Sequence, residues 1–267
     1  MDFVKLAVVG AGPVGIYFAK LCLDNGHKVT LIESGNVNQE SKLLSKDNYV
    51  FKSPSALPVG VHKIGGGSNL WRGRISEFQE LDFGLQGATQ DKKWPFEKNE
   101  LVKHYAKIYN LLELETVTDK DFLLKYFANE VNQLSRLFEI RLFRFCKSDF
   151  FIKLFRSIEY HPDLEVLTNH FCKSITKSRF TQELELELLT ETLTPKKITF
   201  DAVVIACGTL QTTALLQRSE TLLSKDTIKT LGHFLMEHLE GYVGKAWISN
   251  KNEKLSLIHI SEPTRPY

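Results

Sequence analysis

The first 33 residues place a glycine motif in the setting that a dinucleotide-binding fold requires. Residues 10–15 read Gly-Ala-Gly-Pro-Val-Gly, which is the G-x-G-x-x-G turn. The apolar residues 3–9 precede it, and an apolar run with helical spacing leads to a second apolar stretch, residues 29–32. Glu33 follows this stretch, 18 residues after the third glycine. A strand, a glycine turn, a helix and a second strand ending in an acid predict a βαβ unit that binds a dinucleotide.

Each glycine of the turn has its own physical reason in such a unit. Gly10 permits the tight turn, Gly12 lets the backbone approach a pyrophosphate, and Gly15 lets the helix pack closely on the strand. The helix begins at Pro13 and Val14, and its N-terminal turn offers free N–H groups, although none from Pro13, and the positive end of the helix dipole to phosphates. We therefore expect all five residues to contact the cofactor.

The acid at the end of the second strand restricts the choice of dinucleotide. Glu33 accepts hydrogen bonds from both hydroxyls of an adenosine ribose and repels a 2′-phosphate. The sequence therefore predicts a dinucleotide other than NADP, with Glu33 and the adjacent Ser34 at its ribose. The alternative is a glycine-rich turn that merely closes a βαβ unit, and the full strand, turn and helix context argues against it.

Composition excludes several other classes of function. The 267 residues suffice for one large or two small domains, and 43% are hydrophobic. A net charge of +2 argues against nucleic acid or a membrane surface as partner, and no apolar run reaches membrane-spanning length. The four cysteines are scattered, as expected for buried thiols in a reducing compartment, so we expect a cytoplasmic protein. They are Cys22, Cys146, Cys172 and Cys207.

The rest of the chain alternates between helical and strand-like segments. A helix is expected after Pro95, with Leu101, Tyr105 and Ile108 on one face. Residues 119–160 are helix-like, basic and aromatic, and we interpret them as part of a packed insertion rather than as a nucleic-acid surface. Short strands are then expected at 164–167, 171–178, 184–190, 198–200 and 201–208, followed by a helix at 210–218.

A second glycine-rich segment gives the chain a family resemblance. Residues 65–74 read Gly-Gly-Gly-Ser-Asn-Leu-Trp-Arg-Gly-Arg. With the first turn, and with the later segments Leu81–Phe83, Trp94-Pro95, Ala206–Gln211 and Gly232–His238, this order of motifs resembles the glucose–methanol–choline (GMC) oxidoreductases. The resemblance implies an α/β fold: a three-layer Rossmann-like FAD/NAD(P)-binding domain with a helical insertion, whose C-terminal substrate domain is missing from this chain.

The resemblance also implies a cofactor, FAD, and a second and third place of contact with it. The three glycines from Gly65 let the backbone approach the flavin closely, and the Asn69 amide would polarise the flavin ring. Leu70 stands where some relatives attach the flavin through a histidine, so FAD is expected to be non-covalent. The further contacts implied are Gly66, Gly67, Ser68, Asn69, Trp71, Arg74, Ala206, Cys207 and Gly208.

The activity implied is oxidation of a CH–OH group of an alcohol or sugar, with hydride passing to flavin N5 while a histidine takes the proton. That histidine would lie beyond Lys254, so no catalytic residue is assigned. Two alternatives stay open. One is another class of FAD oxidoreductase, such as an amine oxidase or a ketosteroid dehydrogenase, and the other is a non-catalytic FAD-binding fragment. The alcohol, the electron acceptor and the oligomeric state are not predicted.

These expectations divide the chain into four parts. Residues 1–74 and 161–254 form the FAD-binding domain, and residues 75–160 form the helical insertion that begins the substrate cap. Residues 255–267 read Leu-Ser-Leu-Ile-His-Ile-Ser-Glu-Pro-Thr-Arg-Pro-Tyr, which resembles a translated sequencing adapter. We expect this tail to play no part in the fold.

Overall fold

The computed structural model describes residues 4–44, 61–78, 80–83, 94–117, 121–126, 128, 143–178, 181–233 and 235. The first half contains β1 (Lys5–Val9), α1 (Pro13–Asp24), β2 (Lys28–Ile32), η1 (Lys42–Leu44), η3 (Gly66–Asn69), β3 (Arg74–Ile75), α2 (Glu80–Phe83) and α3 (Lys98–Leu111). The second half contains β4 (Arg144–Phe145), α5 (Phe150–Ile158), β5 (Leu164–Leu167), β6 (His170–Lys177), β7 (Leu184–Thr190), β8 (Pro195–Phe200), β9 (Ala202–Ile205), α6 (Gly208–Gln217), η4 (Glu220–Leu222) and α7 (Lys225–Thr230).

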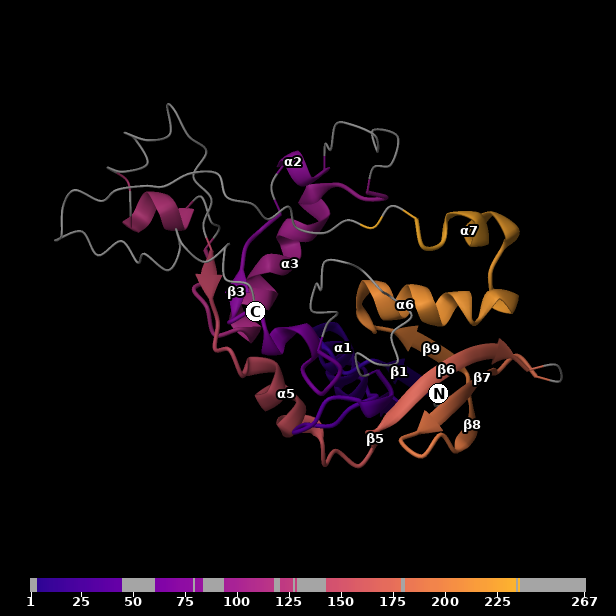
Figure 1. The fold of residues 1–267 in the computed structure, drawn as a ribbon. Coiled ribbons are helices and arrows are strands. Elements are labelled where there is room, and N and C mark those ends of the chain that lie inside the picture. The colour runs from indigo at the N-terminus through magenta and orange to yellow at the C-terminus, as the bar shows by residue number, and fades with distance from the viewer. Residues whose placement is uncertain are drawn as a thin grey trace, which may run out of the picture.

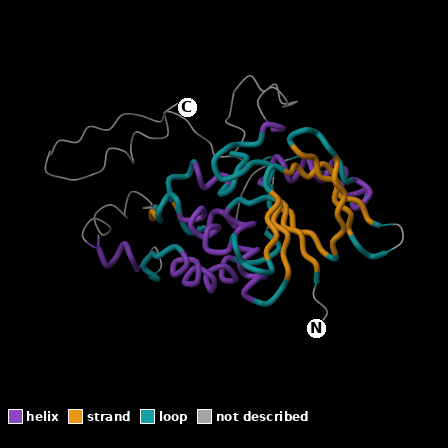
Figure 2. Tube along the Cα trace, turned by 90° about the horizontal axis from the view of Figure 1, so that it is seen from below, coloured by secondary structure: helices purple, strands orange, loops and turns teal. Residues whose placement is uncertain are grey.

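The described chain forms three layers (Figures 1 and 2). A parallel four-stranded sheet in the order β5-β2-β1-β9 is the middle layer. Helices α1 and α5 cover one face of it, and the antiparallel sheet β6-β7-β8 lies with α6 on the other. This arrangement confirms the predicted α/β fold class.

Within the middle sheet, β1 is apolar on both faces because both faces are covered. Along β1, Leu6 and Val8 pack against α1, whereas Ala7 and Val9 pack against the antiparallel sheet. Successive side chains of a strand point to opposite faces, so a continuous apolar strand supplies two cores at once. This is why the sequence of β1 shows no polar alternation.

The antiparallel sheet shows the opposite pattern, as the sequence predicts. In β7, Leu186 and Leu188 are fully buried, whereas Glu185 and Glu187 pair with lysines of β8 and β6 at its surface. One face of this sheet therefore belongs to the core and the other meets solvent.

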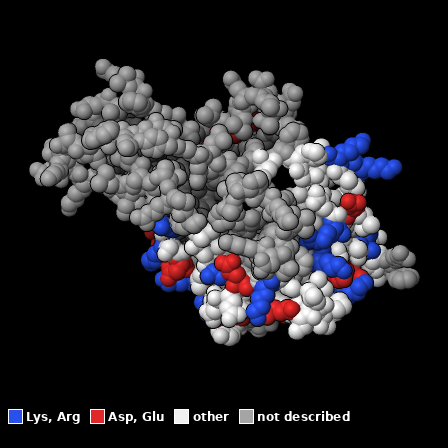
Figure 3. Space-filling model, viewed as in Figure 1, with Lys and Arg blue, Asp and Glu red and all other residues white. Residues whose placement is uncertain are grey.

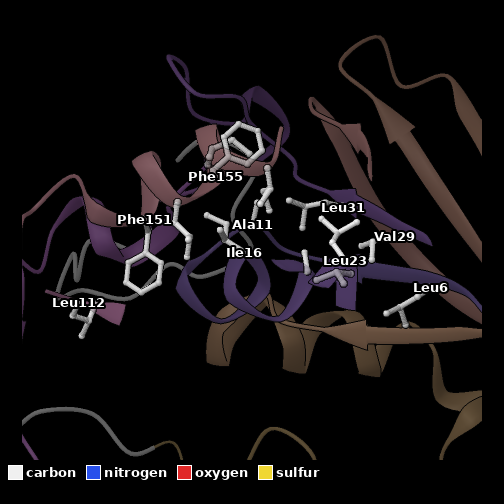
Figure 4. Packing of buried hydrophobic residues seen from close by; sticks show 14 of the residues in the cluster. Leu6, Ala11, Ile16, Leu23, Val29, Leu31, Leu112, Phe151 and Phe155 are labelled. Carbon is white, nitrogen blue, oxygen red and sulfur yellow. The ribbon is translucent and has the colours of Figure 1, made fainter. Parts of the chain in front are cut away.

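Helix α5 lies against α1 in the core beneath the parallel sheet. Its buried residues are Phe151, Leu154, Phe155 and Ile158, which recur at the spacing of one helix face. Figure 4 shows Phe151 and Phe155 on the same side of the sheet as Ile16 of α1. The division of the chain at residue 160 stays a prediction, but the last helix of the segment assigned to the insertion shares the core of the nucleotide-binding layers.

A short antiparallel ribbon joins the start of that segment to the residues just before α5. β3 pairs with β4, and next to it Cys146 N–H donates to the carbonyl of Gly73 at 2.9 Å. Arg144 of the ribbon donates to the carbonyls of Glu115 and Val117 at 2.8 and 2.5 Å, with its guanidinium 4.2 Å from the ring centre of Tyr109. The ribbon thus ties the end of α3 to the region of the glycine loops.

The surface of the described residues carries both positively and negatively charged side chains. On the face shown in Figure 3, Lys and Arg side chains alternate with Asp and Glu over the described part. No described helix has the length and apolarity needed to span a bilayer. All four cysteines are free. The segment Glu237-His238 and the adapter-like tail lie outside the described residues.

Candidate functional site

A cavity of about 320 Å³ opens at the carboxyl edge of the parallel sheet. Its wall is built from the ends of β1, β2 and β9, the first turn of α1, one side of α6, the start of β6, and the start of η3 with the loop before it. The structure brings many of the predicted cofactor residues into this wall: Gly10, Gly12, Pro13, Val14, Glu33, Ser34, Gly66, Gly67, Ala206, Cys207 and Gly208. The other five, Gly15, Ser68, Asn69, Trp71 and Arg74, do not line it.

Two glycines of the first turn are required by packing. Gly10 has φ +100°, and a Cβ there would lie 2.5 Å from the carbonyl oxygen of Ala206. A Cβ on Gly15 would lie 1.9 Å from the carbonyl oxygen of Gly10, so α1 approaches β1 closely only because residue 15 is glycine. Both roles match the sequence argument for a tight turn and a close helix–strand contact.

Three other glycines are not required by packing. A Cβ built on Gly12, Gly67 or Gly208 meets no described atom within 4 Å, and all three residues line the cavity. A side chain there would extend into free space beside the cavity rather than into the protein. The backbone is therefore bare where a phosphate or a flat ring would lie against it.

The N-terminus of α1 is well suited to anions. Helix α1 begins at Pro13 after Gly12, and no side chain among the described residues caps it. The N–H groups of a first helical turn have no partner within the helix, and the helix dipole is positive at this end. Gly12, Pro13 and Val14 also border the cavity, so this turn offers a phosphate site inside it.

The two glycine segments touch each other. Gly65 N–H donates to the carbonyl of Ala11 at 2.8 Å, and a Cβ on Gly66 would lie 2.9 Å from Cα of Gly12. Gly66 also has φ +48°, a conformation that favours glycine. The second segment is therefore docked on the first, and together they form one continuous wall of the cavity.

Ser68 and Asn69 stabilise the second segment from within. Ser68 donates through Oγ to the carbonyl of Gly65 at 2.6 Å. The Asn69 amide donates to the carbonyls of Gly66 and Ile64 at 2.8 and 3.2 Å, so both of its N–H groups are used inside the loop. These bonds fix the position of the Asn69 side chain in the loop, and its expected contact with the flavin stays a prediction.

Trp71 and Arg74 follow the loop and lie away from the cavity. The Trp71 ring packs against the hydrophobic core, 5.5 Å from the ring centre of Phe151. Within the described part of the chain, its buried Nε1–H has no hydrogen-bond partner. Arg74 begins β3. Neither of these two predicted cofactor residues lines the cavity.

Glu33 is buried, with 7% of its surface exposed, and it links β2 to the first turn. One carboxylate oxygen accepts from Ala11 N–H at 2.9 Å, and the other accepts from Ser34 Oγ at 3.1 Å and Gly35 N–H at 3.2 Å. A carboxylate can accept about four hydrogen bonds. Glu33 lines the cavity, so capacity remains for a ligand hydroxyl.

Sequence reasoning missed the far wall of the cavity. That wall is formed by the first residues of β6 and by one side of α6, namely His170, Phe171, Cys172, Gln211, Leu215 and Arg218, and His62 lines the cavity as well. The backbone N–H of His170 donates to the carbonyl of Glu33 at 3.0 Å, so the start of β6 lies beside the end of β2. Apart from Gln211, which ends the Ala206–Gln211 motif, no local motif marks these residues, because only the folded chain brings them to the cavity.

Two thiols of the wall are held protonated. Desolvation raises the pKa of Cys172 to about 12, with a smaller contribution from nearby Cys207. Desolvation likewise raises the pKa of Cys207 to about 12, with Glu33 contributing. Cys207 Sγ lies 3.2 Å from the carbonyl oxygen of Val9. These thiols are therefore neutral wall groups at physiological pH.

Solved oxidase structures share this fold. A fungal aryl-alcohol oxidase matches with a TM-score of 0.53 at 14% identity, over 82% of this chain and 48% of its own. Pyridoxine 4-oxidase from Mesorbium loti matches with a TM-score of 0.50 at 14% identity, over 81% of this chain and 52% of its own. The chain thus spans about half the length of these two structures. No family model and no curated protein sequence matches it.

Proposed function

We propose that this chain forms the FAD-binding part of an oxidoreductase that acts on CH–OH groups of an alcohol or sugar. The observation that carries the proposal is the contact between the two glycine segments, through Gly65 N–H and the carbonyl of Ala11, on the wall of the cavity that Glu33 also lines. The GMC-like order of the motifs and the fold shared with two solved oxidases support it.

The residues of the wall fit the parts of FAD. The first turn of α1, at Gly12 to Val14, would bind the pyrophosphate, and Glu33 would bind the adenosine ribose. Gly66 and Gly67 expose bare backbone beyond the pyrophosphate, as an extended flavin dinucleotide requires. When bound, FAD supplies a ring that accepts a hydride from carbon. These residues bind and orient it.

Among the FAD-dependent classes, residues 65–74 favour the GMC type over an amine oxidase or a ketosteroid dehydrogenase. No catalytic base is proposed within the described residues. Leu70 is 51% exposed and has no group that bonds covalently to a flavin, so we propose that FAD is bound non-covalently.

Purification of the chain with added FAD tests this proposal. The protein should retain yellow flavin absorption through gel filtration, and acid denaturation should release the flavin intact. A colourless protein that binds NAD tightly would overturn the proposal. Flavin that stays on the denatured protein would overturn the non-covalent attachment alone.

A further inference from the structure

The cavity continues past Glu33 along β6 and α6. His170 N–H donates to the carbonyl of Glu33 at 3.0 Å, so the first residue of β6 lies beside the acid. Phe171 and Cys172 line the next part of the wall, and Leu215 and Arg218 face it from α6 and its end. A ligand that runs from the α1 turn past Glu33 therefore arrives between β6 and α6.

Arg218 stands at the rim of this region in a fixed position. Its Nε donates to the carbonyl of Lys173 at 2.6 Å, and its guanidinium lies 5.2 Å from the ring centre of Phe171. A cation held over an aromatic face by a backbone acceptor has lost much of its freedom. The orientation of the Arg218 guanidinium is therefore fixed before any ligand binds.

Within the described part of the chain, the Arg218 guanidinium has no counter-ion. Among the described residues no carboxylate forms an ion pair with Arg218, and only Nε has a hydrogen-bond acceptor. Partial burial lowers its pKa from the ordinary arginine value. The Nη groups of Arg218 thus offer several N–H donors at the rim of the cavity.

The order of groups in a dinucleotide decides what lies beside Arg218. With the pyrophosphate on the α1 turn and the ribose on Glu33, the next group outward is the base. We propose that Arg218 is a binding residue for the adenine base, donating from Nη to a ring nitrogen while Phe171, Cys172 and Leu215 form the wall around it. This inference rests on the proposed function, because it takes its ligand from the FAD assignment.

The chemistry of the wall favours a base over a second phosphate. Its other members here are a phenyl ring, a buried leucine and a neutral thiol, which suit a flat heteroaromatic ring. Adenine offers both acceptor nitrogens and a π-face to a guanidinium. The side chains of Phe171 and Leu215 in this wall offer a phosphate no hydrogen-bond donor.

Calorimetric titration with two probes tests the inference: ADP, which carries the base, and ribose 5-phosphate, which lacks it. Arg218→Ala should lower the affinity for ADP by on the order of fivefold to tenfold, because the base contact is lost. The affinity for ribose 5-phosphate should stay unchanged, because this probe has no base. FMN, which lacks the adenosine half of FAD, should bind the variant and the parent chain equally. Arg218→Lys keeps the charge without the planar fork and should recover part of the ADP affinity.

Arg156→Ala is the matched control, because Arg156 lies on α5 and pairs with Glu159. It should leave ADP affinity unchanged, and thermal melts should show that all variants fold. Equal ADP affinity in Arg218→Ala and the parent chain overturns the inference and leaves the proposed function standing. An equal loss of affinity for ADP and for ribose 5-phosphate in Arg218→Ala also overturns the inference, because Arg218 would then bind phosphate. Failure of the parent chain to bind either FAD or ADP overturns both.

Discussion

At the scale of single residues, Glu33 does two things at once. Its carboxylate holds Ala11 N–H of the first glycine turn and Gly35 N–H of the following loop, and it also lines the cavity. Hydrogen bonds to a charged group contribute about 1.5–3 kcal/mol each. The residue that would recognise the ribose therefore also shapes the turn that would receive the phosphates.

Glu33→Ala should lower FAD affinity at least tenfold and lower the melting temperature, because a ribose contact and two buried backbone N–H groups lose their acceptor. Fluorescence titration with FAD and a thermal melt measure the two effects. Glu40→Ala is the control, since Glu40 is exposed in the nearby loop and should change neither quantity. Equal losses in the two variants would refute the role given to Glu33.

Gly66 and Gly67 should respond differently to alanine. Gly66→Ala places a Cβ 2.9 Å from Cα of Gly12 at φ +48°, and such strain costs about 1–3 kcal/mol of folding stability. Gly67→Ala meets no described atom, so stability should change by less than about 0.5 kcal/mol while FAD affinity falls. Urea denaturation and FAD titration separate the two effects. A stable Gly66→Ala chain with unchanged affinity would contradict the loop contact.

At the scale of elements, the composition of α5 and its packing point to different parts of the fold. Its aromatic and basic composition suggested an insertion, yet four of its side chains join the α1 core. Helix periodicity was visible in the sequence, but the partner of the apolar face was not, because that partner lies more than 100 residues earlier.

Phe155→Ala should destabilise the chain by about 3–5 kcal/mol, because a fully packed phenyl ring leaves a cavity between α5 and α1. Chemical denaturation measures the change. Tyr160, two residues after α5, is 88% exposed, and Tyr160→Ala should stay within about 0.5 kcal/mol of the parent chain. Similar small effects in both variants would mean that α5 is not docked as described.

Most of the regular elements could be predicted from the sequence, since local patterns determine them. β5 and β7 have the predicted bounds, 164–167 and 184–190, and α6 begins at Gly208, two residues before the predicted start. The wall residues that come from motifs were found in the same way. Arg218 and His170 were not, because only the pairing of distant strands brings them to the cavity.

At the scale of the whole molecule, the two sheets meet at a pair of thiols, one buried and one partly buried. Cys172 belongs to the antiparallel sheet and Cys207 follows β9 of the parallel sheet, and desolvation raises the pKa of each from 9.0 to about 12. The unfolded chain loses these protons near pH 9, whereas the folded chain keeps them to about pH 12. Their contribution to stability is therefore complete below pH 9 and is lost as the pH rises towards 12.

The free energy of unfolding should consequently fall above pH 9, by up to about 1.4 kcal/mol per pH unit for each thiol. Urea denaturation under reducing conditions at several pH values from 7 to 10 measures the slope. In Cys207→Ala one of the two thiols is absent, so the decline should be shallower than in the parent chain. Identical slopes would show that these thiols do not titrate as described.

The docking of Gly66 on Gly12 bears on the order in which the protein assembles. The N-terminal βαβ unit holds the phosphate turn and the acid, but one side of its ligand cavity arrives some 50 residues later in the chain. A chain in which only that unit has formed has no closed cavity to offer. Under the proposed function, a bound dinucleotide would therefore indicate that both segments are in place, and it would stabilise the docked arrangement over every partly assembled one.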